Sequence, residues 1–566
     1  MKINKFFKMK KWLKWITACF AVFFCLLFVF IFIFLIRIDF KKPNIDSLIP
    51  EGTVEVNGYI KRFRNSFICT QKKDEYGISE IYLKGDPVER GTAFGELAQG
   101  ELYEQEKFFI DQINVLVPSE RYLKFLRLFA VIFNRNLGEN IPLEYRQEIC
   151  AMSHFCSSAF DFVGPAYERQ LFYHAAHDIG HIMQGYMLAG CTSFAAWGDC
   201  SSDSQLIVGR NFDFYVGDDF ARNKLVNFYV PDKGYKFVSI GWAGMVGVLS
   251  GMNDQGLCIT INAAKGDIPF SSATPVSILA REILQYASTI EEAHAIAQKY
   301  KTFISESFLV ASALDGHAVI IEKTPSQMDI CISTNQYIVC ANHFQSPSLA
   351  SNTINQENIS TSDSFYRYLR MDELIKNHTM VDGRKISPKD AADILRDYRG
   401  LHDEDIGLGN TKCINQFICH HSVIFKPSEK LLWVSARPWQ MGEYVCYDLK
   451  EIFADENYDF KGRMDRPDLI LPTDQHLLQI SDQVKLFRKK SDLLLSDKEE
   501  WSEDEISDFI QLNPTFYHTY EILGDYYFQH SDKEKSCSYW AQALQKEIPS
   551  RGDEIRISKK IKVYDK

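Results

Sequence analysis

Positive charge is scarce in this sequence. Its 566 residues hold 63 Lys and Arg against 74 Asp and Glu, a formal net charge of −11, and no basic stripe follows the first residues. A nucleic-acid-binding surface needs a local surplus of Lys and Arg to neutralise phosphates. The composition therefore argues against nucleic acid as a main partner.

The polar bias of a disordered chain is also absent. Hydrophobic residues make up 46% of the chain and aromatic residues 13%. A chain of this length and composition can bury a large core, and it is long enough for more than one folding unit.

Charged residues are missing altogether from Trp15 to Ile36. This run is long enough to cross a bilayer core of about 30 Å as a helix, and a cluster of lysines precedes it. We therefore expect residues 1–40 to form a basic cytoplasmic tail and a signal-anchor transmembrane helix, which makes this a single-pass membrane protein with its catalytic domain on the non-cytoplasmic side. A cleaved signal peptide is the competing interpretation, and the sequence leaves open whether the helix is removed.

The fourteen cysteines do not define the redox compartment. Cys150 with Cys156 and Cys413 with Cys419 could pair in an oxidising compartment, whereas buried free thiols fit equally well. Disulfide pairing and oligomeric state stay open at this stage.

One stretch suggests covalent chemistry. Gly190 directly precedes Cys191-Thr192-Ser193, and an Arg-x-x-Asp at Arg210 and Asp213 follows. A cysteine that becomes an N-terminus by cleavage of Gly190–Cys191 carries its own base, because a free α-amine has a pKa of roughly 7.7 to 8.0. Before cleavage the thiol could attack the Gly190 carbonyl. The alternative is a turn that leads a buried, inert cysteine into a strand.

Four ordered motifs carry a family resemblance. They are Gly190-Cys191-Thr192-Ser193, Gly209-Arg210-Asn211-Phe212-Asp213, Gly251-Met252-Asn253-Asp254-Gln255-Gly256-Leu257 with Ile261-Asn262, and Ala341-Asn342-His343-Phe344. Together they resemble the acyl-CoA:6-aminopenicillanic acid acyltransferase family of autoproteolytic N-terminal-nucleophile hydrolases, over about Gly85 to Arg437. The choloylglycine hydrolases and acid ceramidase are more distant relatives. The resemblance implies an α+β fold, a four-layer αββα sandwich.

The resemblance also implies roles for single residues. Arg210 would hydrogen-bond the Cys191 thiolate and lower its pKa, and Asp213 would hold or orient the new α-ammonium. Asn262 and Asn342 are the candidate oxyanion donors, and Arg437 matches a late arginine that the superfamily places near the site. The alternatives are a surface ion pair between Arg210 and Asp213, a turn role for Asn262 and a structural cation at Arg437.

The pattern along the chain divides it into four parts. After residues 1–40 we expect a pro-segment or small chain at 41–190, the hydrolase core at 191–450 and a helical region at 451–566. Helices are predicted at 275–286 and at 290–300, the second capped by Thr289 with Glu292. Strands are predicted at 53–63, 204–214, 236–240, 247–250, 256–261, 308–313, 318–322 and 337–341, and a helical stretch at about 85–113.

The C-terminal region contains one tetratricopeptide-like pattern. Tyr520-x-x-Leu523-Gly524-x-x-Tyr527 is followed by Trp540, Ala543 and Pro549. A single repeat cannot bury its faces alone, so we expect it to pack with helices from 474–512. These helices could dock a protein partner or cap the enzyme domain.

Three histidines share one predicted helix face. His174, His177 and His181 lie at i, i+3 and i+7, a spacing that could bind a metal. Acyl transfer through a thiol needs no metal, and no other ligand is tied to the cluster, so no metal and no cofactor are expected. We expect these residues to shape the chain around the cleavage site.

The sequence thus predicts a membrane-anchored, self-processing amidohydrolase or acyltransferase. It would act on a small-molecule N-acyl amide or acyl donor through a Cys191 thioester. Outside the cytoplasm acyl-CoA is scarce, which would favour amide hydrolysis or amide-to-amine transfer over CoA-dependent acylation. A non-catalytic anchored scaffold and a metal-dependent hydrolase built on His174 are the alternatives. The acyl group and the amine cannot be inferred, although aromatic side chains could line an acyl pocket: Phe194, Trp197, Phe212, Phe214, Tyr215 and Trp242.

Overall fold

The structure is a computed structural model of the chain. It describes residues 39–71, 73–116, 131–175, 188–215, 217, 219–266, 273–455, 458, 470–471, 475–496 and 500–564. His177 and His181 lie outside these residues, as does the apolar run from Trp15 to Ile36.

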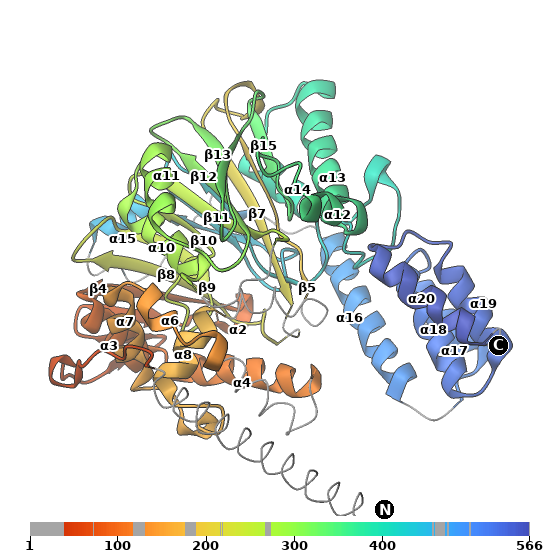
Figure 1. The fold of residues 1–566 in the computed structure, drawn as a ribbon, viewed down its shortest axis with the longest axis horizontal. Helices are drawn as coiled ribbons and strands as arrows, with labels where there is room; N and C mark the ends of the chain where they lie inside the picture. Colours follow the sequence, from red (N-terminus) through yellow and green to blue (C-terminus); the bar gives the residue numbers. More distant parts are fainter. Residues whose placement is uncertain are drawn as a thin grey trace, which may run out of the picture.

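Two β-sheets form the centre of the molecule (Figure 1). In spatial order the larger sheet contains β1 (Glu55–Asn57), β2 (Ile60–Phe63), β3 (Ser66–Cys69), β4 (Ile78–Gly85), β8 (Lys224–Pro231), β9 (Phe237–Gly241), β10 (Ser250–Asn253), β11 (Leu257–Ala263), β12 (Glu306–Ser312), β13 (His317–Lys323) and β14 (Met328–Ile332). The smaller sheet contains β15 (Tyr337–Cys340), β6 (Thr192–Ala196), β7 (Ile207–Tyr215), β16 (Cys419–Lys426), β17 (Leu431–Ser435), β18 (Tyr444–Asp448) and β19 (Ile470–Leu471), and β5 (Leu188–Ala189) pairs with β7.

The sheets pack face to face, with helices on both outer faces. Alternate residues of a strand point to opposite faces, and β12 illustrates the result: Leu309 and Ala311 belong to the apolar core between the sheets, whereas Phe308 and Val310 belong to the core beneath the helices. The larger sheet is covered by α3 (Pro87–Leu97), α7 (Leu143–Ser153), α8 (Ala166–His174), α10 (Val276–Tyr286) and α11 (Ile290–Lys299). The smaller sheet is covered by α13 (Ser364–Lys376) and α14 (Pro388–Leu395). The expected α+β class is confirmed, and the layers follow the expected order of helices, sheet, sheet and helices.

Further helical segments lie between these elements. The α-helices among them are α2 (Lys73–Tyr76), α4 (Gln99–Leu116), α6 (Leu137–Asn140), α12 (Thr353–Thr361) and α15 (Leu449–Ala454). Single turns form η1 (Asp46–Leu48), η2 (Ser158–Phe160), η3 (Gly198–Cys200), η4 (Asn377–Val381) and η5 (Leu401–Asp403).

Local sequence signals explain several boundaries. α11 begins with the predicted capping box, in which Thr289 accepts from the Glu292 N–H and the Glu292 side chain accepts from the Thr289 N–H. The strand predicted at 247–250 is wrong, since β10 begins only at Ser250. There the backbone approaches α10 instead: Val248 N–H donates to the Ser277 carbonyl at 2.8 Å, and a Cβ on Gly247 would lie 2.6 Å from Ser277 Oγ.

Residues on either side of Gly190 share one core. β4 runs parallel to β8, from Ile78 opposite Lys224 to Gly85 opposite Pro231. Because the segment before Cys191 supplies four strands of the larger sheet and three of the covering helices, it is an integral part of the fold.

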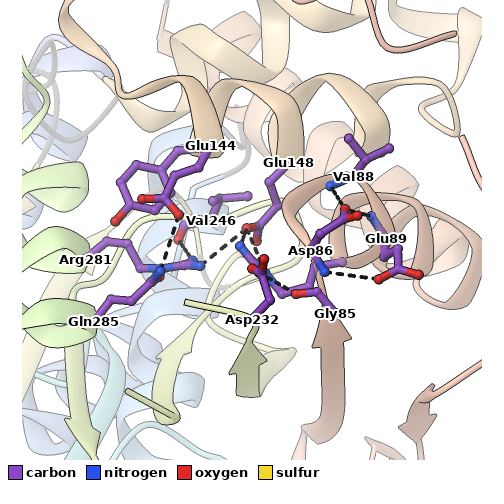
Figure 2. Close-up of polar contacts among 12 residues, drawn as sticks. Gly85, Asp86, Val88, Glu89, Glu144, Glu148, Asp232, Val246, Arg281 and Gln285 are labelled. Atoms are coloured by element: carbon purple, nitrogen blue, oxygen red, sulfur yellow. Dashed lines mark hydrogen bonds and ion pairs between the residues drawn. The ribbon is translucent and has the colours of Figure 1, made fainter. Parts of the chain in front are cut away.

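A buried ion network also joins the two parts (Figure 2). Glu148 on α7 accepts from Arg90 Nη2 at 2.8 Å and from Arg281 Nη2, on α10, at 3.3 Å, and the side chains of all three residues are fully buried. Arg281 Nη1 also donates to the Val246 carbonyl at 2.7 Å. Removing one member of such a network leaves an uncompensated buried charge, which costs about 3–5 kcal/mol.

The C-terminal helices form a separate bundle at the side of the sandwich (Figure 1). They are α16 (Gln475–Ser496), α17 (Glu503–Leu512), α18 (Tyr517–Gln529), α19 (Lys533–Ala543) and α20 (Arg551–Tyr564). Their aromatic core includes Phe487 of α16 and Trp540 of α19. The glycine of the tetratricopeptide-like pattern is required by packing, since a Cβ on Gly524 would lie 2.3 Å from the Trp540 ring.

The predicted membrane localisation is corrected by the helices observed. Across the residues that the structure describes, no helix combines the length and the apolar character needed to cross a bilayer. Among the described helices α16 is the longest, at 22 residues, and it contains charged side chains such as Lys485, Arg488 and Asp492.

Candidate active site

Cys191 lies in the interior of the smaller sheet. β5 ends at Ala189 and β6 begins at Thr192, and both strands pair with β7. The Gly190 N–H donates to the Asp213 backbone oxygen at 2.9 Å, and Cys191 has no exposed surface. The peptide bond predicted to be cleaved is therefore buried and held against β7.

The Arg210 guanidinium lies against the Cys191 thiol. Its Nη2 is 3.5 Å from Cys191 Sγ and also donates to the Ile261 carbonyl, and its Nη1 donates to the Leu249 carbonyl at 3.2 Å. Arg210 is fully buried, and within the described part of the chain no carboxylate lies at ion-pair distance from it. The surface ion pair considered as an alternative is not formed. A guanidinium without a counterion favours a thiolate beside it.

Burial nevertheless keeps the thiol protonated in the intact chain. It raises the pKa of Cys191 to about 11, with Arg210 acting in the opposite direction and Asp213 adding to the rise. At neutral pH the Cys191 sulfur is therefore a thiol, and its activation requires a base.

Asp213 carries a buried and under-coordinated carboxylate. Its Oδ2 accepts from Gln416 Nε2 at 3.4 Å, and its Oδ1 accepts from no N–H or O–H group of the described residues, although the Cys419 thiol lies beside the carboxylate. Burial raises the pKa of Asp213 to about 7, against the lowering effects of Arg367, Arg210 and the Cys419 thiol. A buried carboxylate without an ion-pair partner is a site for a cation that the intact chain does not supply.

The two candidate oxyanion donors, Asn262 and Asn342, lie close to β6, the strand that begins directly after Cys191. Asn262 Nδ2 donates to the Cys340 carbonyl at 3.0 Å and its Oδ1 accepts from Ser193 Oγ at 3.3 Å. Asn342 Nδ2 donates to the Ala263 carbonyl at 2.8 Å. A side-chain amide nitrogen has two N–H groups, so each asparagine has one used by a backbone carbonyl and a second one left.

Arg367, not Arg437, is the second arginine at the nucleophile. Arg367 Nη1 donates at 2.8 Å to both the Cys191 carbonyl and Thr192 Oγ1, and its Nη2 donates to Asn342 Oδ1 at 2.9 Å. The described contacts of Arg437 lie elsewhere: its N–H donates to the Tyr76 carbonyl at 2.8 Å. The role of Arg367 could not be predicted from the sequence, because α13 has no motif that ties it to Cys191.

Gln416 is a second residue whose role could not be predicted from the sequence. Its Nε2 donates to the Gly190 carbonyl oxygen at 2.7 Å, and the side chain is 2% exposed. It precedes β16 by three residues and is 226 positions from Gly190, so no local pattern could have found it.

Two buried histidines lie next to Arg210: His421 contacts its guanidinium, and His420 contacts His421. Ser250 Oγ and Arg210 Nη1 contact His421 Nε2 at 2.9 and 3.4 Å, and His421 Nδ1 is 2.9 Å from His420 Nδ1. Arginine can only donate, so His421 Nε2 accepts, His421 Nδ1 donates, and His420 carries its proton on Nε2. Burial lowers the pKa of His420 to about 3 and that of His421 well below its usual range, so both rings are neutral.

The aromatic residues proposed for an acyl pocket separate into two groups. Phe212, Phe214 and Trp242 stack with one another, with ring centroids 5.7 to 6.4 Å apart, and Phe220 joins them. Phe194 instead packs in the core beneath α13 and α14. The stacked group borders a small cavity that α4 and α8 close from the other side.

His174 is occupied by structural hydrogen bonds. Its Nδ1 is 2.7 Å from the Gln170 carbonyl, and its Nε2 accepts from the Val246 N–H at 2.9 Å. Burial lowers the pKa of His174 to about 4. Neither ring nitrogen is left to bind a metal, and nowhere in the described ranges do three His, Cys, Asp or Glu side chains gather as a metal site would require. The proposed partners His177 and His181 lie outside the described residues.

The cysteine pairs left open by the sequence are free thiols. Cys150, Cys156, Cys413 and Cys419 form no disulfide. Cys413 instead donates to the Tyr398 carbonyl at 3.2 Å.

Comparison with known families supports the motif-based resemblance. The family model "Acyl-coenzyme A:6-aminopenicillanic acid acyl-transferase" matches residues 200–434. The matched range includes Arg210, Asp213, Asn262 and Asn342 but begins after Cys191 and ends before Arg437. The match bears out the family resemblance that the motifs carry in this part of the chain.

Individual relatives are distant. An uncharacterized protein of Archaeoglobus fulgidus is 24% identical over 332 residues, which cover 52% of this chain and 54% of that protein. Protein dcd1A of Dictyostelium discoideum is 25% identical over 228 residues, which cover 38% of this chain and 52% of dcd1A. The chain thus spans about half the length of the curated relatives that it matches. Among solved structures, the Caenorhabditis elegans N-acylethanolamine-hydrolyzing acid amidase ortholog has a TM-score of 0.32 and 18% identity, covering 42% of this chain and 93% of that one.

Proposed function

On the premise that residues 200–434 form an acyl-coenzyme A:6-aminopenicillanic acid acyl-transferase family domain, we propose that this protein is a self-processing cysteine N-terminal-nucleophile enzyme. It cleaves its own Gly190–Cys191 bond and then acts, as an amidohydrolase or acyltransferase, on a small N-acyl amide or acyl donor. The small chain is residues 41–190 and the large chain begins at Cys191.

One observation carries this proposal: Asp213 is a buried carboxylate next to the Gly190–Cys191 bond, and within the described residues no cation lies at ion-pair distance from it. Asp213 accepts the Gly190 N–H through its backbone, and its carboxylate shares the Gln416 amide with the Gly190 carbonyl. Cleavage creates an α-ammonium at Cys191, which is the cation that this carboxylate lacks.

The atoms and electrons of the proposed self-cleavage balance without a cofactor. Cys191 Sγ attacks the Gly190 carbonyl carbon, the C–N bond breaks, and the thiol proton passes to the departing nitrogen of Cys191. Water then hydrolyses the thioester, which leaves a carboxylate on Gly190 and a free thiol on Cys191.

In the mature enzyme the same sulfur attacks the substrate. The α-amine of Cys191 is the general base, Asp213 orients it, and Arg210 stabilises the thiolate at 3.5 Å from the sulfur. The free N–H groups of Asn262 and Asn342 are proposed as donors to the tetrahedral oxyanion. Arg367 links Asn342 to the Cys191 carbonyl and so fixes the distance between donor and nucleophile.

Hydrolysis and transfer are both compatible with this chemistry. The preference for an amide over acyl-CoA as acyl donor depended on a location outside the cytoplasm, and the correction of that localisation removes it. The acyl acceptor, water or an amine, is therefore left to experiment.

The test is turnover of a panel of N-acyl amides by the purified chain, with intact-mass detection of an acyl-enzyme. We expect a transient mass increase equal to the acyl group and no activity in Cys191→Ala. Cys258→Ala is the matched control, because Cys258 is equally buried but lies in the core between the sheets. Activity that survives Cys191→Ala and disappears with a chelator would refute the proposal in favour of metal-dependent hydrolysis.

A further inference from the structure

Gln416 contacts the one atom on which charge develops during self-cleavage. When the Cys191 sulfur attacks, the Gly190 carbonyl oxygen becomes the oxyanion of the tetrahedral intermediate. In the intact chain that oxygen accepts from Gln416 Nε2 at 2.7 Å. A donor at this distance, fixed in a buried site, is the arrangement that stabilises such an intermediate.

The chemistry of its neighbours fixes the orientation of the Gln416 amide. Nε2 lies near the Gly190 carbonyl at 2.7 Å and Asp213 Oδ2 at 3.4 Å, and both of these atoms can only accept when the carboxylate is ionised. The reversed amide would place Oε1 against two acceptors. The nitrogen must therefore face the scissile carbonyl.

Gly190 is the residue type that this contact permits. A Cβ at position 190 would lie 2.7 Å from Gln416 Nε2 and 2.9 Å from its Oε1. Separations below 3.0 Å force one group to move, so any side chain at position 190 would displace the amide from the carbonyl. A glycine is therefore required before the nucleophile for two reasons: its backbone freedom, and the space that the Gln416 amide occupies beside it.

The backbone on both sides of Gln416 is anchored. Asn415 N–H donates to the Asp397 carbonyl at 2.8 Å, and Asn415 Oδ1 accepts from the Phe417 N–H at 3.0 Å. Phe417 has a φ of 55°, a left-handed conformation that a non-glycine residue adopts only when its surroundings impose it.

The C-terminal bundle supplies part of this anchor. Arg488 of α16 donates from Nη2 to the Phe417 carbonyl at 2.8 Å, and its guanidinium lies 5.1 Å from the Trp439 ring. Ile480 and Val484 of the same helix pack against Phe417. One function of the bundle is therefore to hold the Gln416 loop in place.

We propose that Gln416 is a catalytic residue of self-cleavage, whose side-chain amide stabilises the oxyanion formed on Gly190. This inference rests on the proposed self-processing function and adds to it a group that no sequence motif marks. Asn262 and Asn342 then serve the substrate reaction, and Gln416 serves the maturation reaction.

The test compares cleavage rates of the full chain with Gln416→Leu, Gly190→Ala and Gln440→Leu. Leucine keeps the size of glutamine but cannot donate. Gln440 is the matched control, since it is fully buried and donates to the Leu395 carbonyl at 3.4 Å, away from the scissile bond. Each protein is synthesised in a cell-free system, and the two cleaved chains are quantified over time by intact mass.

We expect Gln416→Leu to slow cleavage by about 10²- to 10³-fold, the usual effect of removing one oxyanion donor. Gly190→Ala should slow it as well, and Gln440→Leu should cleave at the wild-type rate. Hydroxylamine, which cleaves thioesters, should not restore cleavage of Gln416→Leu, because the defect precedes thioester formation.

Three outcomes would overturn the inference. Cleavage of Gln416→Leu at the wild-type rate excludes a role for the amide, and rescue by hydroxylamine places the defect after the oxyanion step. If Gln416→Leu fails to fold, the Gly190→Ala variant provides the test. Cleavage of folded Gly190→Ala at the wild-type rate would likewise exclude a role for the amide. A wild-type chain that folds without cleavage overturns the proposed function itself, which keeps the two failures distinct.

Discussion

Replacing Asp213 by Asn in a chain that cannot cleave itself should stabilise the protein at alkaline pH. The background is Cys191→Ala, so that no α-ammonium forms to neutralise the carboxylate. Asn has the shape of the protonated acid and carries no charge. The substitution therefore isolates the free-energy cost of ionising a buried carboxylate.

The magnitude follows from the shift in pKa. Burial raises the pKa of Asp213 from 3.8 to about 7. Between these values the folded chain holds a proton that the unfolded chain has lost, so stability falls as pH rises from about 4 to about 7. About three pKa units at 1.36 kcal/mol each give a cost of about 4 kcal/mol above pH 7. Asp213→Asn avoids this cost.

The assay is urea unfolding of Cys191→Ala with and without Asp213→Asn, at pH 4.5 and pH 8. We expect the Asn variant to gain about 1 kcal/mol at pH 4.5, where the unfolded Asp213 carboxyl is already mostly ionised, and about 4 kcal/mol at pH 8. Asp390→Asn is the control, because the N–H and hydroxyl of Ser387 hold the pKa of Asp390 below its ordinary value despite its partial burial, so the ionised form stabilises the fold and the Asn variant should be less stable at pH 8. If Cys191→Ala has the same free energy of unfolding with and without Asp213→Asn at both pH values, Asp213 is not an uncompensated buried anion.

Three further predictions concern the contacts around the cleavage site. Arg210→Lys should lower kcat/KM of the mature enzyme by at least about 10-fold, since an ammonium group cannot reproduce the planar guanidinium that contacts Cys191. Steady-state kinetics on the N-acyl amide that is turned over fastest will measure this. Glu148→Ala should destabilise the chain by about 3–5 kcal/mol, because Arg90 and Arg281 lose their shared buried partner, and a lower urea midpoint would register it. Arg488→Leu should slow self-cleavage by less than Gln416→Leu, since it acts only through the Phe417 carbonyl, and an unchanged cleavage rate would exclude a bracing role for α16.

Local and ordered signals in the sequence predict much of the fold. The Thr289 and Glu292 capping box depends on residues three apart, and the structure has it as predicted. Alternating apolar residues predict strands on both sides of the core, and the ordered motifs predict two sheets between helices. The error at 247–250 arose because the backbone there bonds to α10, a contact that no local pattern contains.

The candidate site is only partly encoded in local sequence. Cys191, Arg210 and Asp213 were predictable because the adjacent strands β6 and β7 bring them together. Arg367 and Gln416 come from segments 176 and 226 positions away from their partners at the cleavage site. A residue at such separation shows its role only through the tertiary fold.

For Arg437 and His174, position in the sequence did not indicate which contacts the residue makes. Arg437 follows β17 at the expected place in the chain, yet its backbone pairs with Tyr76. His174 has the spacing of a metal ligand, but both ring nitrogens are used inside the fold. Spacing along a helix identifies a shared face and does not show whether the side chains on it are free.

The most direct test of the account is the intact mass and N-terminal sequence of the purified protein beside its Cys191→Ala variant. We predict that the wild type consists of two associated chains, the larger one beginning Cys191-Thr192-Ser193, and that the variant is a single chain. If the folded wild type also remains one chain, self-processing at Gly190–Cys191 is wrong and the central claim falls with it.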